Sequence, residues 1–186
     1  NKALLTTVME STQLILDSGV EVLNHTGNKT KPTDQDIFNT WLNDIFNSEP
    51  YYPQNGFLDD LLSSGKLGIF KNQDLRNLLS SWKPKVAVLD EKFGALVENE
   101  NVLNNYVLEH GSWLNADQVD QKKRNIKFPV SGFKVDNRIL LEALVFENLI
   151  ENVVILADSY YSYQKETLQF VNEIIALLET ELAHSP

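Results

Sequence analysis

Apolar side chains recur along most of the chain at the spacing of an amphipathic helix. Between residues 2 and 23, leucine, isoleucine and valine return every three or four positions, which predicts a first helix with Gly19 as a weak point inside it. A second helix is predicted after Pro32, with Thr33 or Asp34 as its N-cap. Its apolar stripe, which we expect to lie in the core, consists of Ile37, Phe38, Trp41, Leu42, Ile45 and Phe46.

The stretch PYYPQNGFLDDLLSSGKLGIFKNQDLRNLLSSW, from Pro50 to Trp82, contains two short apolar faces separated by turn residues. Its two prolines stop the preceding helix, because proline removes a backbone donor. Gly65 stands where a helix commonly ends in a left-handed residue, and Asn72 is placed to cap the next helix. We therefore interpret the stretch as a structural corner between helices rather than a ligand clamp.

Three further segments complete the pattern. The helix that begins after Asn72 is predicted to run to about His110, with a kink or interruption at Pro84. Residues 112–135 have weak periodicity and form a long connection, for which a short strand or helical turn is allowed. Residues 136–185 are expected to form one very long helix; a break within residues 159–162 is the alternative.

These patterns predict the fold class. No run of four to eight residues alternates between apolar and polar positions with β-branched enrichment, so strands are not expected. We predict an all-α protein, an irregular helical bundle with long N- and C-terminal helices. A chain of 186 residues without a visible linker is expected to form a single domain, residues 1–186.

The chain is acidic, which changes the partners that are expected. It contains 16 Lys and Arg residues against 26 Asp and Glu residues, a formal net charge of −10. Nucleic acid is not expected as a partner, because affinity for a phosphate backbone depends on clustered cations. The run Lys122-Lys123-Arg124, with Lys127 after it, lacks the interleaved aromatic residues of a single-strand binder and is interpreted as a solvated loop.

The sequence predicts no catalytic, cofactor-binding or metal-binding residues. The chain contains no cysteine, which excludes disulfides, thiolate ligands and cysteine nucleophiles. Its three histidines, His25, His110 and His184, are not spaced to place two imidazoles on one metal. Glycine-rich phosphate-binding motifs are missing from the sequence as well.

Carboxylates lie near one another in the sequence at three places. These are Asp59 with Asp60, Glu98 with Glu100, and Glu142 with Glu147. An acidic helical protein is expected to have many carboxylates on exposed faces, so we interpret these pairs as surface charge. A hydrolase-like enzyme, with a site built from dispersed acids and His110, is the alternative.

Tyrosines gather at Tyr51-Tyr52 and within residues 160–163. We expect Tyr160 and Tyr163 to lie in the core and Tyr161 to be partly exposed. A partner surface is the alternative, because clustered tyrosines provide a large amphipathic contact area.

The run LLSSGKLGIFKNQDLRNLLSSW resembles a family of membrane-anchored domains of unknown function from Bacteroidota-type Gram-negative bacteria. The matching residues are Phe57, Leu61, Leu62, Ser64, Gly65, Leu67, Ile69, Asn72, Leu75, Arg76 and Leu79. A weaker similarity covers residues 144–153 and 170–182, and Trp82 stands where the family usually has tyrosine. The resemblance implies an N-terminal transmembrane helix followed by a soluble, largely helical periplasmic domain, with no catalytic residue to transfer.

The hypothesis from these features is a non-enzymatic protein-interaction or sensory module in the periplasm. No apolar run of the chain approaches the about 18 to 20 residues that cross a bilayer. A tether to the inner membrane is therefore expected in a segment that precedes Asn1. A protein partner or self-association is expected, and the two alternatives are the enzyme with His110 and a structural spacer of the envelope.

Overall fold

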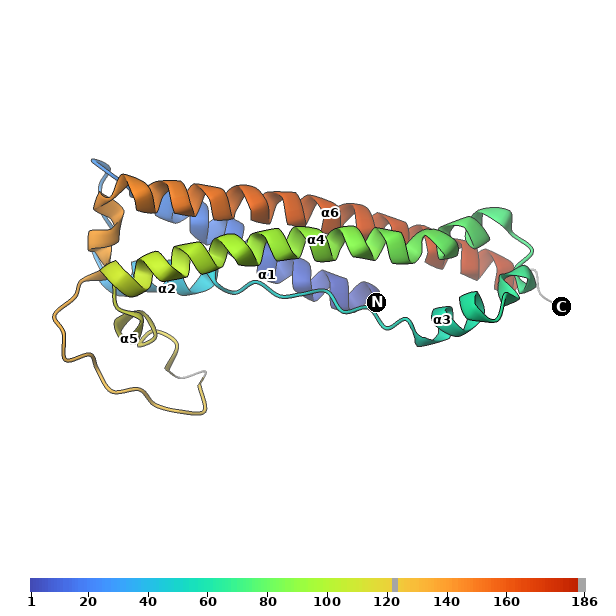
Figure 1. Cartoon of the computed structure of the whole chain (residues 1–186), viewed down its shortest axis with the longest axis horizontal. Coiled ribbons are helices and arrows are strands. Elements are labelled where there is room, and N and C mark those ends of the chain that lie inside the picture. The colour runs from blue at the N-terminus through green and yellow to red at the C-terminus, as the bar shows by residue number, and fades with distance from the viewer. Residues whose placement is uncertain (122–123, 184–186) are drawn as a thin grey trace.

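The computed structural model describes residues 1–121 and 124–183, and within these ranges its regular secondary structure is entirely helical (Figure 1). The elements are α1 (Lys2–Leu23), α2 (Gln35–Ile45), α3 (Gly56–Ser63), the 3₁₀ helix η1 (Lys66–Ile69), α4 (Gln73–His110), α5 (Trp113–Ala116), the 3₁₀ helix η3 (Asn137–Glu142) and α6 (Leu144–Ala183). The prediction of an all-α helical bundle with long N- and C-terminal helices is confirmed.

Two long helices give the molecule its elongated shape. Helices α4 and α6 have 38 and 40 residues, run antiparallel and pack along their length (Figure 1). At 1.5 Å per residue each is about 60 Å long. Helix α1 packs on α6, and α2 packs on α1. Among the described residues, no helix combines the length and apolar character needed to span a membrane.

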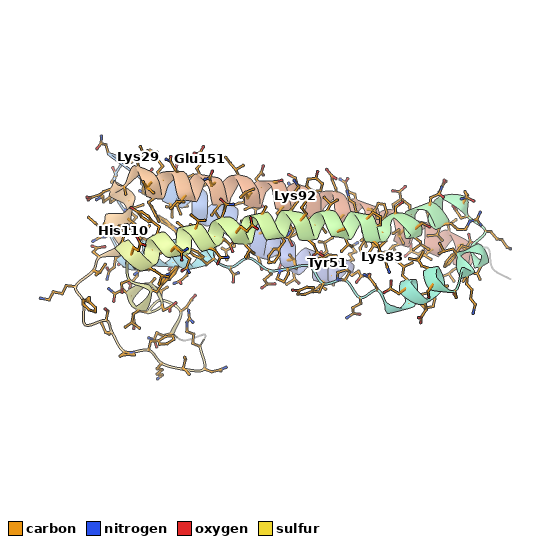
Figure 2. All side chains as sticks on the ribbon, in the orientation of Figure 1. Lys29, Tyr51, Lys83, Lys92, His110 and Glu151 are labelled. Atoms are coloured by element: carbon orange, nitrogen blue, oxygen red, sulfur yellow. The ribbon has the colours of Figure 1, made fainter. Side chains whose placement is uncertain are left out.

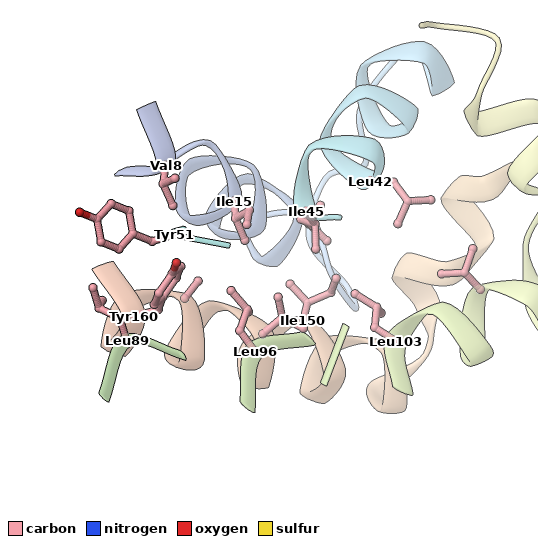
Figure 3. Close-up of a cluster of buried hydrophobic side chains, with 14 of the residues drawn as sticks. Val8, Ile15, Leu42, Ile45, Tyr51, Leu89, Leu96, Leu103, Ile150 and Tyr160 are labelled. Atoms are coloured by element: carbon pink, nitrogen blue, oxygen red, sulfur yellow. The ribbon is translucent and has the colours of Figure 1, made fainter. Parts of the chain in front are cut away.

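The core is a continuous seam of buried side chains between α1, α2, α4 and α6. Figure 3 shows Val8 and Ile15 of α1 facing side chains of α4 and α6, among them Leu96 and Ile150. All four of these residues are at most 1% exposed. Burying the apolar stripes of four helices against one another is the main favourable contribution to the stability of the bundle.

The corner from Pro50 to Trp82 has the local geometry that its sequence predicts. Gly65 has φ +67° after α3, the left-handed region in which glycine is favoured. Asn72 caps α4, with its side chain accepting from the Leu75 backbone N–H at 3.1 Å. The Trp82 indole N–H donates to Oδ1 of Asn55 at 2.7 Å, which joins the start of α3 to α4.

Of the two predicted effects of Pro84, a kink or an interruption, the interruption does not occur. The helix is continuous from Gln73 to His110 with Pro84 inside it. Pro84 and Ser80, whose carbonyl loses its helical donor, are both exposed, so water can satisfy that carbonyl. Trp82 and Val86, on either side of the proline, are buried in the core, and this packing stabilises the helix on both sides of Pro84.

The last long helix begins later than predicted. Residues 137–142 form η3, and Ala143 has extended backbone with φ −101° and ψ 123°, so α6 starts at Leu144 and not at residue 136. Asp136 accepts from the Arg138 backbone N–H, which caps η3 separately. From Leu144 to Ala183 the helix is unbroken, which confirms continuity through residues 159–162.

The apolar stripe of α2 is narrower than predicted. Phe38, Leu42 and Ile45 are fully buried, but Ile37 is 44% exposed and Trp41 is half-buried. Asp34 provides the cap, accepting from the Asp36 backbone N–H at 2.9 Å. The buried face of α2 is therefore set by its packing on α1, α5 and η3.

Candidate functional site

A buried asparagine fixes the base of the connection between α4 and α6. The Asn137 side-chain amide donates to Oδ1 of Asn39 on α2 at 2.8 Å and to the Ser112 carbonyl at 3.1 Å. Its own Oδ1 accepts from the Ser112 backbone N–H at 2.8 Å. Because buried polar groups must be paired, these bonds fix the positions of α2, α5 and η3 relative to one another.

Further side-chain amides fold the connection back on itself beyond α5. The Asn115 amide donates to the Val135 carbonyl at 2.8 Å, and the Gln121 amide donates to the Phe128 carbonyl at 2.8 Å. Both bonds join residues on opposite sides of the turn. The connection is thus held by its own polar side chains, although residues 124–135 contain no helix.

Residues 124–135, which we call the basic loop, project from the bundle at the end opposite the C-terminus (Figure 1). The loop exposes Ile126, Val130 and Phe133, and the last two are 76% and 81% exposed. None of the 26 acidic residues of the chain lies in it, whereas it contains the cations Arg124, Lys127 and Lys134. Exposed apolar side chains gathered with one sign of charge are typical of an interaction surface.

The sequence pattern predicts the charge of this loop but not its exposed apolar side chains. Arg124 pairs with the Asp117 carboxylate, so part of the basic run does lie in a solvated ion pair. Lys122 and Lys123 lie outside the described residues. The missed signal is the occurrence of Ile126, Val130 and Phe133 in a segment without helical periodicity.

His110 lies at the C-terminal end of α4, close to the base of the connection (Figure 2). Its ring centroid is 4.3 Å from that of Tyr106, and its Nε2 is 3.8 Å from the Glu109 carboxylate. His110 and Glu142 line one shallow cavity of about 290 Å³. The structure therefore brings one predicted acid near His110, but Glu142 is ion-paired with Lys31.

The other histidines take no part in that cavity. His25 stacks on Trp41 with 5.3 Å between ring centroids, and its Nδ1 contacts the Thr30 carbonyl. His184 lies outside the described residues. Within residues 1–121 and 124–183, no group of three His, Asp or Glu side chains is arranged to hold a metal ion.

The three carboxylate pairs of the sequence are separated in space or engaged elsewhere. Asp59 pairs with Lys83 at 2.7 Å, and Asp60 is exposed. Glu147 accepts from the Thr26 hydroxyl, away from the Glu142 ion pair. These contacts join α3 to α4, and the connection between α1 and α2 to η3 and α6.

Glu100, which was expected to be surface charge, is a buried carboxylate. It is 7% exposed, and its Oε2 accepts from the Ser48 hydroxyl at 2.7 Å, while its Oε1 has no partner among the described residues. Burial raises the pKa of Glu100 to about 7. The sequence feature that indicates this burial is the position of Glu100 in the buried stripe of α4, four residues after Leu96 and three before Leu103.

The tyrosines are mainly core residues. Tyr160 is fully buried and donates to the Glu49 carbonyl at 3.2 Å, and Tyr161 and Tyr163 are intermediate in exposure. Tyr51 is 1% exposed, and burial raises its pKa to about 12. Tyr52, at 72% exposed, is the one of these five that lies mostly in solvent.

The Pro50–Trp82 corner borders an apolar cleft at the other end of the molecule from the basic loop. The cleft has a volume of about 270 Å³. It lies between α1, α3, α4 and α6 and is lined by Asn1, Lys2, Gln54, Asn55, Leu58, Leu79, Trp82, Val171, Ile174 and Ile175. Its lining is mainly apolar, and Lys2 provides the one titratable side chain among these lining residues.

Comparison of the chain with protein-family models, with curated proteins and with solved structures gives no match. The resemblance to a membrane-anchored family therefore stays a prediction. Function has to be inferred from the residues of this chain.

Proposed function

We propose that this protein is a non-enzymatic interaction or sensory module that belongs to a membrane-anchored protein of the periplasm. The observation that supports this function best is the basic loop. It exposes Val130 and Phe133 to solvent while Asn137 and Asn115 hold its base in place. Large apolar side chains that stay exposed to water on a loop of fixed position are unfavourable in free energy, and binding of a partner would bury them.

The position of the loop suits a sensory role. It connects the end of α4 to η3 and α6, so both long helices begin or end at its base (Figure 1). Those helices pack along the length of the bundle. Occupation of the loop would bias the packing of α4 against α6, which is the physical link that a signal along the bundle requires. The periplasmic and membrane-anchored parts of the proposal rest on the sequence resemblance.

Affinity capture from a native envelope extract tests the proposal, with the intact protein as bait and mass spectrometry as the readout. Phe133→Ser removes the most exposed ring of the loop. Phe57→Ser is the matched control, because Phe57 is also 75% exposed but lies on α3 at the opposite end. We expect capture to be lost with the first variant and kept with the second; equal capture by both would contradict the proposal.

A hydrolase is the second candidate, because His110 and Glu142 line the same cavity. It predicts a turnover on ester or phosphoester substrates that His110→Ala abolishes without changing the circular dichroism spectrum. A structural spacer of the envelope is the third candidate. It requires no binding by the loop, so capture that depends on Phe133 would argue against it.

A further inference from the structure

A groove with acidic walls runs between α1 and α6. Two hollows, of about 380 and 490 Å³, share Gln13 and Asp17 and so form one continuous depression. We call it the acidic groove; its carboxylates are Glu10, Asp17, Glu21 and Asp158. Its apolar lining residues are Met9, Leu14, Leu16, Val20 and Val154.

Charge in the groove has one sign. Neither hollow is lined by a Lys or Arg side chain, and Lys165 lies at the rim with its Nζ 4.3 Å from the centroid of the Tyr161 ring. All four carboxylate residues are exposed, so a partner can reach them. The groove also has apolar contact area, since Leu14 and Val20 are 38% and 47% exposed.

The basic loop is complementary to this groove in charge and in apolar contact area. The loop contains Lys127 and Lys134 besides Arg124, which pairs with Asp117, and the groove has four carboxylates and no lining cation. Each also exposes apolar side chains, Phe133 on the loop and Val20 in the groove. Opposite potentials that face each other across apolar contacts are the arrangement that gives specific association.

The loop is directed away from the groove of its own chain. Asn115 and Gln121 tie it to the base of the connection, and it projects beyond the end of the bundle (Figure 1). The groove follows α1 and α6 along the body of the bundle. A second molecule therefore offers the groove that the loop can reach.

We propose that the partner of the basic loop is a second copy of this chain, whose acidic groove accepts it. This inference rests on the proposed function, because it names the partner of the same loop. Phe133 and Val130 would cover the apolar floor, while Lys127 and Lys134 approach carboxylates of the α1 wall. When two chains exchange loops, each loop enters the groove of the other chain, and this loop–groove contact occurs twice in a closed two-fold dimer.

The test uses two charge-reversal variants of the intact protein. Lys127→Glu with Lys134→Glu reverses the loop, and Asp17→Lys with Glu21→Lys reverses the groove wall. All four positions are exposed, so neither variant is expected to disturb folding, which circular dichroism checks. Sedimentation velocity measures the mass over a concentration series.

We expect the wild-type protein to self-associate at about 0.05 M salt and to dissociate toward monomers at about 0.5 M, where screening is shorter in range. Each variant alone should associate at least about tenfold more weakly, since losing one close charge pair exceeds 1.4 kcal/mol. An equimolar mixture of the two variants should associate again. In that mixture an acidic loop meets a basic wall and a basic loop meets an acidic wall.

The matched control for the loop variant is Lys66→Glu with Lys71→Glu. It changes the net charge by the same amount as the loop variant, on exposed lysines at the opposite end of the molecule. It should associate like the wild-type protein. A monomeric wild-type protein at all concentrations would overturn the inference, and so would a mixture that stays monomeric while the wild type associates. If the wild type is monomeric but capture still depends on Phe133, the interaction module stands and only the second copy is excluded as partner.

Discussion

Replacing the buried carboxyl group of Glu100 by a neutral amide should stabilise the protein at alkaline pH. Glu100 is 7% exposed, and of its two carboxyl oxygens only Oε2 has a described partner, the Ser48 hydroxyl at 2.7 Å. Glu100→Gln keeps the shape of the side chain and an oxygen that can accept from Ser48. It removes the charge that burial disfavours.

The size of this stability change follows from the pKa of Glu100. Burial raises the pKa of Glu100 from 4.5 to about 7, so the native state binds a proton that the unfolded chain has released. The free energy of unfolding therefore falls as pH rises from 4.5 and levels off above 7. At 1.36 kcal/mol per pH unit the full loss is about 3 kcal/mol, a ceiling that water entry and local rearrangement reduce.

Urea unfolding followed by tryptophan fluorescence measures this effect across a pH series. The variant should gain stability relative to the wild type between about pH 4.5 and about pH 8, by about 1–3 kcal/mol. Glu98→Gln is the matched control, because Glu98 lies two residues away on α4 and is exposed. If the stability difference between Glu100→Gln and the wild type does not change with pH, the burial argument is refuted.

Four other substitutions test local features of the fold. Gly94→Ala should stabilise the protein by about 0.5–1 kcal/mol, because the added Cβ meets open space in the middle of α4. Gly19→Ala should destabilise the protein, because its Cβ would lie 2.4 Å from Cγ2 of Val154. Thermal unfolding compares the two variants. Asn72→Ala should lower the free energy of unfolding by about 1 kcal/mol through loss of the α4 cap, measured in urea. Asn137→Ala should cost about 2 kcal/mol or more and speed hydrogen exchange around α5, because it leaves buried partners unpaired.

Local sequence signals predicted the structure correctly where one side chain or a short residue spacing determines the backbone conformation. The bounds of α1, the cap at Asn72 and the left-handed Gly65 all agree with expectation. A cap bonds within three residues of itself, and a positive φ depends on one residue, so neither requires distant contacts. The all-α fold class follows in the same way from apolar periodicity.

The predictions that failed depended on contacts with distant parts of the chain. An interruption of α4 at Pro84 was one of two expected effects, but packing of Trp82 and Val86 on the core maintains the helix. Residues 137–142 were expected to belong to the last helix, but Asn137 is bonded to Asn39, 98 residues away in the chain. Helix propensity is judged from a short window of neighbouring residues, so it cannot include a hydrogen-bond partner that is distant in the chain.

The sequence by itself determined the helices, their caps and the acidic balance of the chain, because these depend on neighbouring residues or on composition. Only the tertiary structure decided that Glu100 is buried, that Asn137 holds the base of the basic loop, and that carboxylates of α1 and α6 share one groove. Each of these depends on segments that are distant in sequence and adjacent in space. The candidate interaction surfaces therefore became visible only after the helices were packed.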